Sequence, residues 1–136
     1  MLTLDAAWIT GNMGMYKSAV RDIQLQPLKA NILATVLSYA FIYGALVLIA
    51  LPSITRPERD GNNKTMTDAE TFKRSVIYAG GLGLVIYGVY NTTTKALLHR
   101  YPWKVCVADT LWGSVMFTMV SFLTLIVVNA CVKKKK

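Results

Sequence analysis

The chain has 136 residues, the length of a single domain, which argues against a multidomain enzyme. Hydrophobic residues make up 54% of it and charged residues only 16%, whereas about 25% is usual for the charged residues of soluble domains. The formal net charge is nevertheless +8. A hydrophobic chain with a basic excess fits either a nucleic-acid-binding protein or a membrane protein with basic flanks. The positions of the charges decide between the two.

Long uncharged segments predict that the chain crosses a membrane. Residues 31–51 and 75–94 carry no charge, and residues 105–132 carry only the carboxylate of Asp109. Because about 20 helical residues cross the hydrocarbon core, we expect full spans at about 29–52, 75–98 and 105–132. A buried core helix is the alternative for each. All Lys and Arg lie outside the uncharged segments, and they are not interleaved with aromatics as in nucleic-acid-binding domains, so we expect no nucleic-acid partner.

The N-terminal residues predict two shorter elements. Residues 1–14 are apolar but too short to cross the bilayer, so we expect a helix that spans part of it. In residues 15–27, Tyr16 and Ala19 recur at helical spacing on one side, and Lys17 and Arg21 lie on the other. This pattern predicts a helix in the membrane interface that ends at Pro27, with a solvated loop as the alternative. The expected fold is an all-α membrane protein, one multi-pass domain over residues 1–136 that forms an antiparallel helical bundle.

Polar segments connect and follow the expected spans. Residues 53–74 read as an exposed loop, in which Thr67 can cap a helix leading into the second span. The chain closes with a basic tail, residues 133–136. Basic residues are somewhat more numerous on the side that holds this loop and the tail, which favours that side as cytoplasmic. The sequon at Asn63 should then carry no glycan. The tail lysines are candidate contacts for lipid or a partner protein: Lys133, Lys134, Lys135 and Lys136.

A polar cluster is expected inside the membrane. Asp5, Asn91 and Asp109 all fall in the same half of the bilayer if the helices run as predicted, and Thr93 and its neighbours can add hydroxyl partners. The spacing D-x-x-W occurs at Asp5 with Trp8 and at Asp109 with Trp112, which places carboxylate and indole on one helix face. Such a cluster is either interhelical glue or a proton or ion site.

Small residues at four-residue spacing would let helix backbones approach closely, at Ala40 with Gly44 and at Ala79 with Gly83. Catalytic signals are scarce. The chain has one histidine, His99, in a basic connection, and no metal-ligand spacing, nucleophile motif or phosphate loop. We therefore expect a non-enzymatic protein with no cofactor, no bound metal and no small-molecule substrate that the sequence identifies.

Three motifs resemble those of domain of unknown function 2177, a family of small four-helix membrane proteins from bacteria with relatives in large DNA viruses. They are Leu4-Asp5-Ala6-x-Trp8, Tyr87-Gly88-x-Tyr90-Asn91-x-Thr93 and Asp109-x-x-Trp112-Gly113. The resemblance covers nearly the whole chain and adds Tyr87 to the expected cluster. Three departures are Asn91, where the family usually has Asp, Thr94, where it usually has Asn, and a first helix about a dozen residues shorter than the family's, which spans fully. The resemblance implies an architecture and no established activity.

The shortened, basic-tailed form is similar to a viral member of that family. The leading expectation is therefore a structural multi-pass protein, a minor component of the internal membrane of a large DNA virus that contacts the bilayer and capsid or neighbouring membrane proteins. The lysine tail also resembles a di-lysine retrieval signal, which implies a membrane derived from the endoplasmic reticulum. The alternative is a small proton- or ion-coupled transporter that uses Asp5, Asn91 and Asp109.

Overall fold

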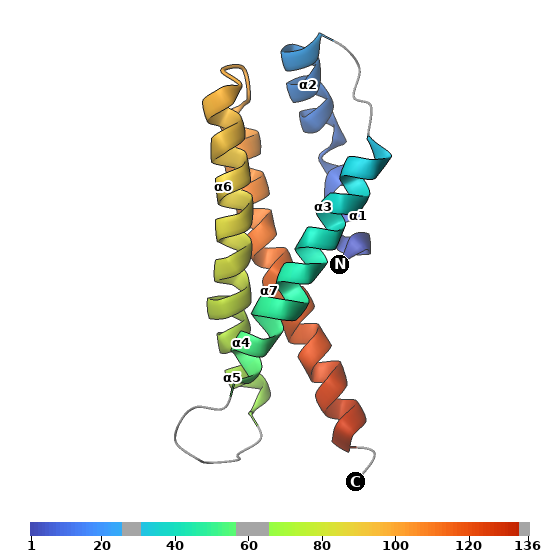
Figure 1. The fold of residues 1–136 in the computed structure, drawn as a ribbon, viewed down its shortest axis with the longest axis vertical. Helices are drawn as coiled ribbons and strands as arrows, with labels where there is room; N and C mark the ends of the chain where they lie inside the picture. The colour runs from blue at the N-terminus through green and yellow to red at the C-terminus, as the bar shows by residue number, and fades with distance from the viewer. Residues whose placement is uncertain (26–30, 57–65, 134–136) are drawn as a thin grey trace.

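The computed structural model describes residues 1–25, 31–56 and 66–133, and all regular structure in these ranges is helical (Figure 1). The all-α prediction is confirmed. The N-terminal part forms α1 (Leu2–Gly11) and α2 (Met13–Gln24), so the boundary between the two short elements lies at Asn12. Pro27, Asn63 and residues 134–136 lie outside the described residues.

Two longer helices follow, each interrupted by a π-helical turn. The first consists of α3 (Ile32–Ala45), the π-helical η1 (Leu46–Ala50) and α4 (Leu51–Thr55). The second consists of α5 (Asp68–Arg74), the π-helical η2 (Ser75–Gly80) and α6 (Gly81–Leu97). A single helix, α7 (Trp103–Lys133), completes the fold. The expected cap is present, because the Thr67 hydroxyl oxygen accepts a hydrogen bond of 3.2 Å from the Glu70 amide.

Two helices in the described part of the chain are long and apolar enough to cross a membrane, Ile32–Thr55 and Trp103–Cys131. They coincide with the first and third predicted spans. The span at 75–98 stays a prediction, since its glycines, threonines and Asn91 make that helix more polar. The first span continues past its predicted end at Pro52 to Thr55. The wider π-helical turn that precedes the proline accommodates a residue with no N–H to donate.

The helices form two arms that meet in the lower half of Figure 1. One arm consists of α6 and the first half of α7, which lie side by side above this crossing. The helix that starts at α3 crosses α7 and reaches α5 with its α4 end. The upper part of that helix leans away and lies beside α1. An antiparallel bundle therefore stays a prediction, because the upper half of the molecule is open.

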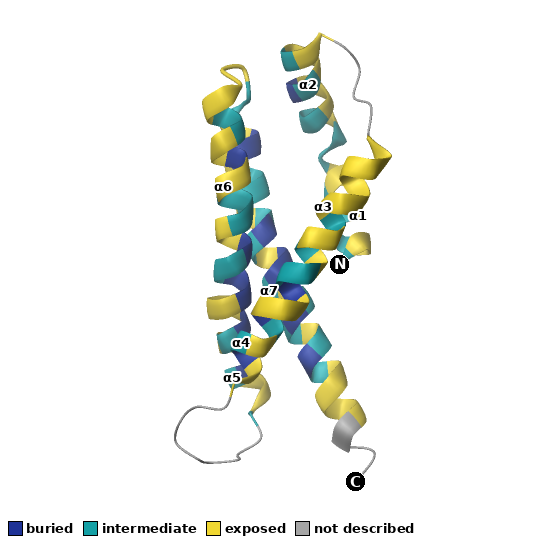
Figure 2. Cartoon of the chain, viewed as in Figure 1, coloured by how far each residue is buried: buried dark blue, intermediate teal, exposed yellow. Residues whose placement is uncertain are grey.

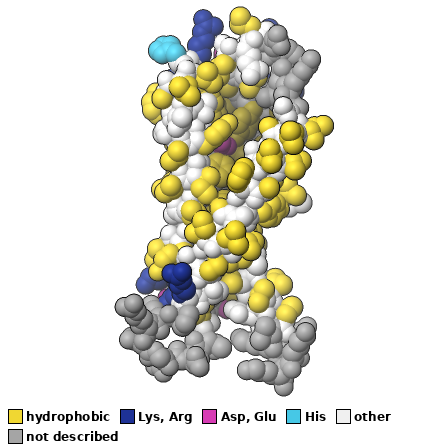
Figure 3. Space-filling view, viewed as in Figure 1, with side chains coloured by type: hydrophobic (Ala, Val, Ile, Leu, Met, Phe, Trp, Pro, Cys, Tyr) yellow, Lys and Arg dark blue, Asp and Glu magenta, His cyan; other side chains and the backbone are white. Residues whose placement is uncertain are grey.

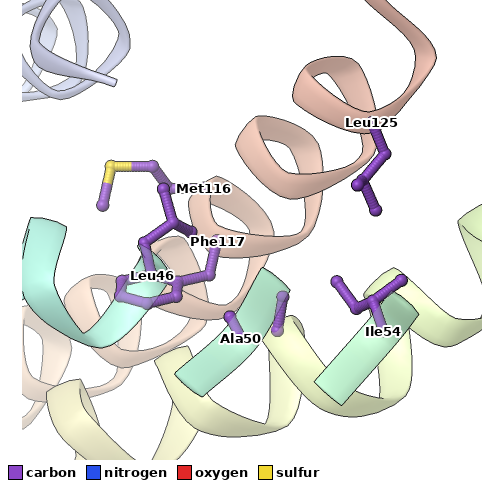
Figure 4. Close-up of a cluster of buried hydrophobic side chains, with 7 residues drawn as sticks. Leu46, Ala50, Ile54, Met116, Phe117 and Leu125 are labelled. Carbon is purple, nitrogen blue, oxygen red and sulfur yellow. The ribbon is translucent and has the colours of Figure 1, made fainter. Parts of the chain in front are cut away.

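The hydrophobic core lies where the helices cross (Figure 4). Leu46, Ala50 and Ile54 come from the first long helix, and Met116, Phe117 and Leu125 come from α7. Ala79 of η2 is completely buried in the same cluster. Two π-helical turns thus pack against α7 at the centre of the fold.

Close approach of α6 and α7 depends on glycine. A Cβ added to Gly83 would lie 2.5 Å from the carbonyl oxygen of Gly113, and one added to Gly113 would collide with the Tyr87 ring. The expected close approach is therefore confirmed at Gly83, and Ala79, one turn earlier, is completely buried. The expectation for Ala40 and Gly44 is wrong for this structure, because Ala40 is exposed and a Cβ at Gly44 would meet nothing.

The upper half of the first long helix has little cover. Every residue from 31 to 38 is exposed, including Ile32 and Leu33 (Figure 2). An exposed apolar helix of this length is typical of a surface that faces lipid or another membrane protein.

Candidate functional site

The carboxylate of Asp109, on α7, accepts hydrogen bonds from two other elements. The Tyr16 hydroxyl of α2 donates to Oδ1 at 2.6 Å, and the Asn91 side-chain amide of α6 donates to Oδ2 at 3.2 Å. Asn91 is fully buried, and its own Oδ1 accepts a hydrogen bond of 2.7 Å from the Tyr101 hydroxyl in the α6–α7 connection. The predicted proximity of Asn91 and Asp109 is therefore a direct contact.

The carboxylate of Asp5, on α1, is held in a similar way by a different pair of donors. The Tyr39 hydroxyl of α3 donates to Oδ2 at 2.6 Å, and the Trp112 indole of α7 donates to Oδ1 at 3.4 Å. The Tyr39 bond ties the exposed first half of α3 to α1.

The two indoles join these carboxylates into one system. Trp8 and Trp112 stack with ring centroids 4.7 Å apart and an interplanar angle of 4°. The Trp8 indole donates a hydrogen bond of 3.0 Å to the Tyr16 hydroxyl, which is itself bonded to Asp109. The tryptophan of each D-x-x-W pair thus serves the aspartate of the other pair, directly or through Tyr16. We call the system the polar network: Asp5, Trp8, Tyr16, Tyr39, Asn91, Tyr101, Asp109 and Trp112.

The sequence patterns did not identify three tyrosines of the network as site residues. The sequence places Tyr16 on the apolar face of an interfacial helix, and Tyr101 stands just before the third expected span, a position typical of the aromatic belt at a membrane surface. Tyr39 carried no signal beyond its place in an uncharged segment. A phenol has an apolar ring and a polar tip, so its pattern in a sequence does not reveal whether the tip meets water, headgroups or a carboxylate.

Two residues expected in the cluster have other positions. Tyr87 accepts the Asn91 amide with its backbone carbonyl at 2.9 Å, and its ring packs on Gly113, so it supports the network from α6. Thr93 is exposed and makes no hydrogen bond to any network residue that the structure describes. The neighbouring Thr92 and Thr94 hydroxyls bond back to carbonyl groups of their own helix. Helical back-bonding satisfies a hydroxyl without a tertiary partner.

The donors to both carboxylates are uncharged. Burial first, and then the hydrogen bond and charge of Asp109, raise the pKa of Tyr16 well above its ordinary value. Burial and the charge of Asp109 also raise the pKa of Tyr101 well above its ordinary value. Both phenols therefore keep their protons at neutral pH. Over the described ranges, neither Asp5 nor Asp109 forms an ion pair with Lys or Arg.

The network is reachable from one side of the molecule. Asp5 and Asp109 are both half-buried. Figure 3 shows an acidic side chain in a hollow between the two arms, in the upper half of the molecule and surrounded by hydrophobic side chains. A recess in which carboxylates lie beside aromatic rings can accept a proton or a cation.

Comparison with known proteins supports the membrane assignment. No curated protein and no solved structure matches the chain. The model of one family, described as a predicted membrane protein (DUF2177), matches residues 1–126. These residues contain the whole polar network, the whole of the apolar helix Ile32–Thr55 and most of the apolar helix Trp103–Cys131. The chain therefore belongs to the DUF2177 family of predicted membrane proteins.

Proposed function

We propose that this protein is a small, non-enzymatic, proton- or cation-coupled transporter that uses Asp5 and Asp109, with Asn91 as the buried amide between α6 and α7. The observation that carries the proposal is the pair of carboxylates in one network, whose donors within the described residues are tyrosine, tryptophan and asparagine. Interhelical glue needs no charge, since amides and hydroxyls serve the same purpose at lower cost. Two acceptor-only carboxylates that pair with no Lys or Arg among the described residues instead favour uptake of a proton or a cation from the recess.

Flux in reconstituted liposomes tests this function. Proteoliposomes containing the full chain are assayed for proton and for sodium or potassium flux, with a pH-sensitive dye and an ion-sensitive dye. Asp109→Asn removes the charge and keeps the shape, and flux should fall at least about tenfold, the effect of about 1.4 kcal/mol. Asp22→Asn is the matched control, because Asp22 is an exposed acid on α2 outside the network. Flux that is equal in wild type, Asp109→Asn and empty liposomes would refute transport.

A second candidate function is a structural one, in the internal membrane of a large DNA virus. The observation in its favour is the exposed apolar surface of α3, which suits lateral contact with a neighbouring membrane protein. In this role the lysine tail beyond α7 would contact an acidic capsid protein or anionic lipid, in a membrane derived from the endoplasmic reticulum.

Replacing Lys133, Lys134, Lys135 and Lys136 by Ser tests the structural role. Incorporation of the variant into purified particles should fall, whereas Lys73→Ser, a single exposed lysine on α5, should incorporate normally. Absence of the protein from purified particles, or unchanged incorporation of the tail variant, would refute the structural role. Neither result would affect the outcome of the transport assay.

A further inference from the structure

We propose that a basic surface at the upper end of the molecule binds the headgroups of anionic phospholipids, and that this binding seats Tyr16 on Asp109. The surface, which we call the basic rim, consists of four exposed side chains: Lys17 and Arg21 on α2, Arg100 in the α6–α7 connection and Lys104 at the start of α7. Through this surface, the position of α2 and of its network residue Tyr16 would respond to lipid, whether the network serves transport or holds helices together.

The two faces of α2 point to different surroundings. Ala19 is buried, and Tyr16, Val20 and Ile23 are half-buried, whereas Lys17 and Arg21 are exposed. The helix therefore lies with its apolar face on the protein and its basic face outward, as in helices that rest in a membrane interface.

The rim residues on α2 and those in and after the α6–α7 connection belong to one surface. The Arg100 guanidinium donates a hydrogen bond of 3.4 Å to the Asp22 carbonyl oxygen, which joins the α6–α7 connection to the last turn of α2. In the described part of the chain, none of the four rim side chains forms an ion pair. Figure 3 shows basic side chains at this end of the molecule. A group of unneutralised cations at one membrane surface is complementary to anionic headgroups.

The end of α2 favours a bilayer lipid over a free anion as the occupant. Leu25, which ends the helix in a left-handed conformation with φ of 55°, is 80% exposed beside Arg21. A free phosphate would gain nothing from an exposed leucine. A phospholipid offers its phosphate to Arg21 and hydrocarbon to Leu25 at the same boundary.

The rim is connected to the network through two tyrosines. Tyr16, one residue before Lys17, donates to Asp109 and accepts from Trp8. Tyr101, one residue after Arg100, donates to Asn91. A headgroup that fixes α2 and the connection therefore also fixes one donor to Asp109 and the donor to its partner amide.

Lipid binding is tested by native mass spectrometry of the full chain, titrated with phosphatidylglycerol or with phosphatidylcholine. Since a basic residue near an anionic surface contributes about fivefold in affinity, Lys17→Gln with Arg21→Gln should weaken phosphatidylglycerol binding about 25-fold. The matched control is Arg56→Gln with Lys73→Gln, two exposed basic residues at the other end of the fold. Equal affinities of the two double variants, or equal binding of both lipids by wild type, would overturn the proposal.

Coupling to the network is tested by tryptophan fluorescence of a Trp103→Phe background, which leaves the stacked Trp8 and Trp112 as reporters. Moving the protein from phosphatidylcholine nanodiscs to nanodiscs with phosphatidylglycerol should shift the emission, and inorganic phosphate should not. Tyr16→Phe should keep lipid binding and lose the shift. An unchanged shift in Tyr16→Phe would refute the coupling, and a shift with inorganic phosphate alone would refute a lipid as the ligand. Neither readout depends on flux.

Discussion

At the scale of single residues, the two carboxylates of the network differ in how firmly their donors are held. Asp109 is bonded by Asn91, which is fully buried between α6 and α7. Asp5 is bonded by Tyr39, which comes from a helix whose preceding turns are all exposed. The surroundings of Asp5 therefore depend on where α3 lies, whereas those of Asp109 depend mainly on the packed α6–α7 pair.

The Tyr39 hydroxyl should contribute measurably to stability. Interhelical hydrogen bonds in membrane proteins contribute about 0.6 kcal/mol on average and up to about 1.7 kcal/mol. Tyr39→Phe should lower the free energy of unfolding by an amount in this range, measured by titration of the micellar protein with a denaturing detergent. Tyr43→Phe, one helical turn later and without a hydrogen bond to a described residue, is the control. Equal stability of the two variants would mean that the bond contributes nothing.

The glycine contact between α6 and α7 gives a second residue-scale prediction. A methyl group at Gly83 would press on the Gly113 carbonyl, which belongs to a backbone that cannot rotate away. Gly83→Ala should therefore destabilise the fold by about 1–3 kcal/mol. Gly81→Ala is the matched control on the same helix, since its Cβ would meet nothing, and helix propensity should stabilise it by up to about 1 kcal/mol. Thermal unfolding followed by circular dichroism should give shifts of opposite sign, and shifts of the same sign would refute the close contact.

At the scale of elements, the α4 end of the first long helix is held by several contacts, whereas the exposed first half of α3 is held mainly by the Tyr39 hydrogen bond. The Arg74 guanidinium of α5 donates to the Arg56 carbonyl oxygen at 3.2 Å and to the Ile54 carbonyl oxygen at 3.5 Å, and it pairs with Glu70 at 3.0 Å. These bonds satisfy carbonyl groups that a helix leaves without partners at its C-terminus. The first long helix is thus attached to the second at its α4 end, and α3 extends from that attachment.

Loss of the Arg74 side chain should loosen this attachment locally. Among the contacts between described residues, Arg74→Ala removes the bonds to the carbonyl groups of Ile54 and Arg56 and the one to Glu70, and should cost about 1–2 kcal/mol. Hydrogen exchange of residues 51–56 should become faster, while exchange in α7 near Phe117 should not change. Lys73→Ala, a substitution at the adjacent exposed position, should leave the rate of hydrogen exchange unchanged in both regions. Protection of 51–56 that is unaffected by Arg74→Ala would show that core packing alone holds α4.

At the scale of the whole molecule, the number of membrane crossings can be decided by cysteine labelling. If the helix from α5 to α6 crosses the bilayer, Thr67 and Leu98 lie on opposite sides of it. In a Cys131→Ser background, with Cys106 buried, Thr67→Cys and Leu98→Cys should react with an impermeant maleimide from opposite sides of oriented vesicles. Labelling of both positions from the same side would refute the span at 75–98. Native Cys131 should label from the Thr67 side.

The sequence by itself determined the helical class, two long apolar helices, the cap at Thr67 and the contact at Gly83, because each follows from local composition or spacing along one helix. It also indicated that Asp5, Asn91 and Asp109 belong together. Only the tertiary structure decided which donors reach each carboxylate, and that Thr93 stays outside. The physical reason is that Tyr16 and Tyr39 come from elements separate from α7, and their hydroxyls meet Asp109 and Asp5 only after α1, α2 and α3 have docked beside α7. The Tyr101 hydroxyl likewise meets Asn91 only when the α6–α7 connection has folded over α6.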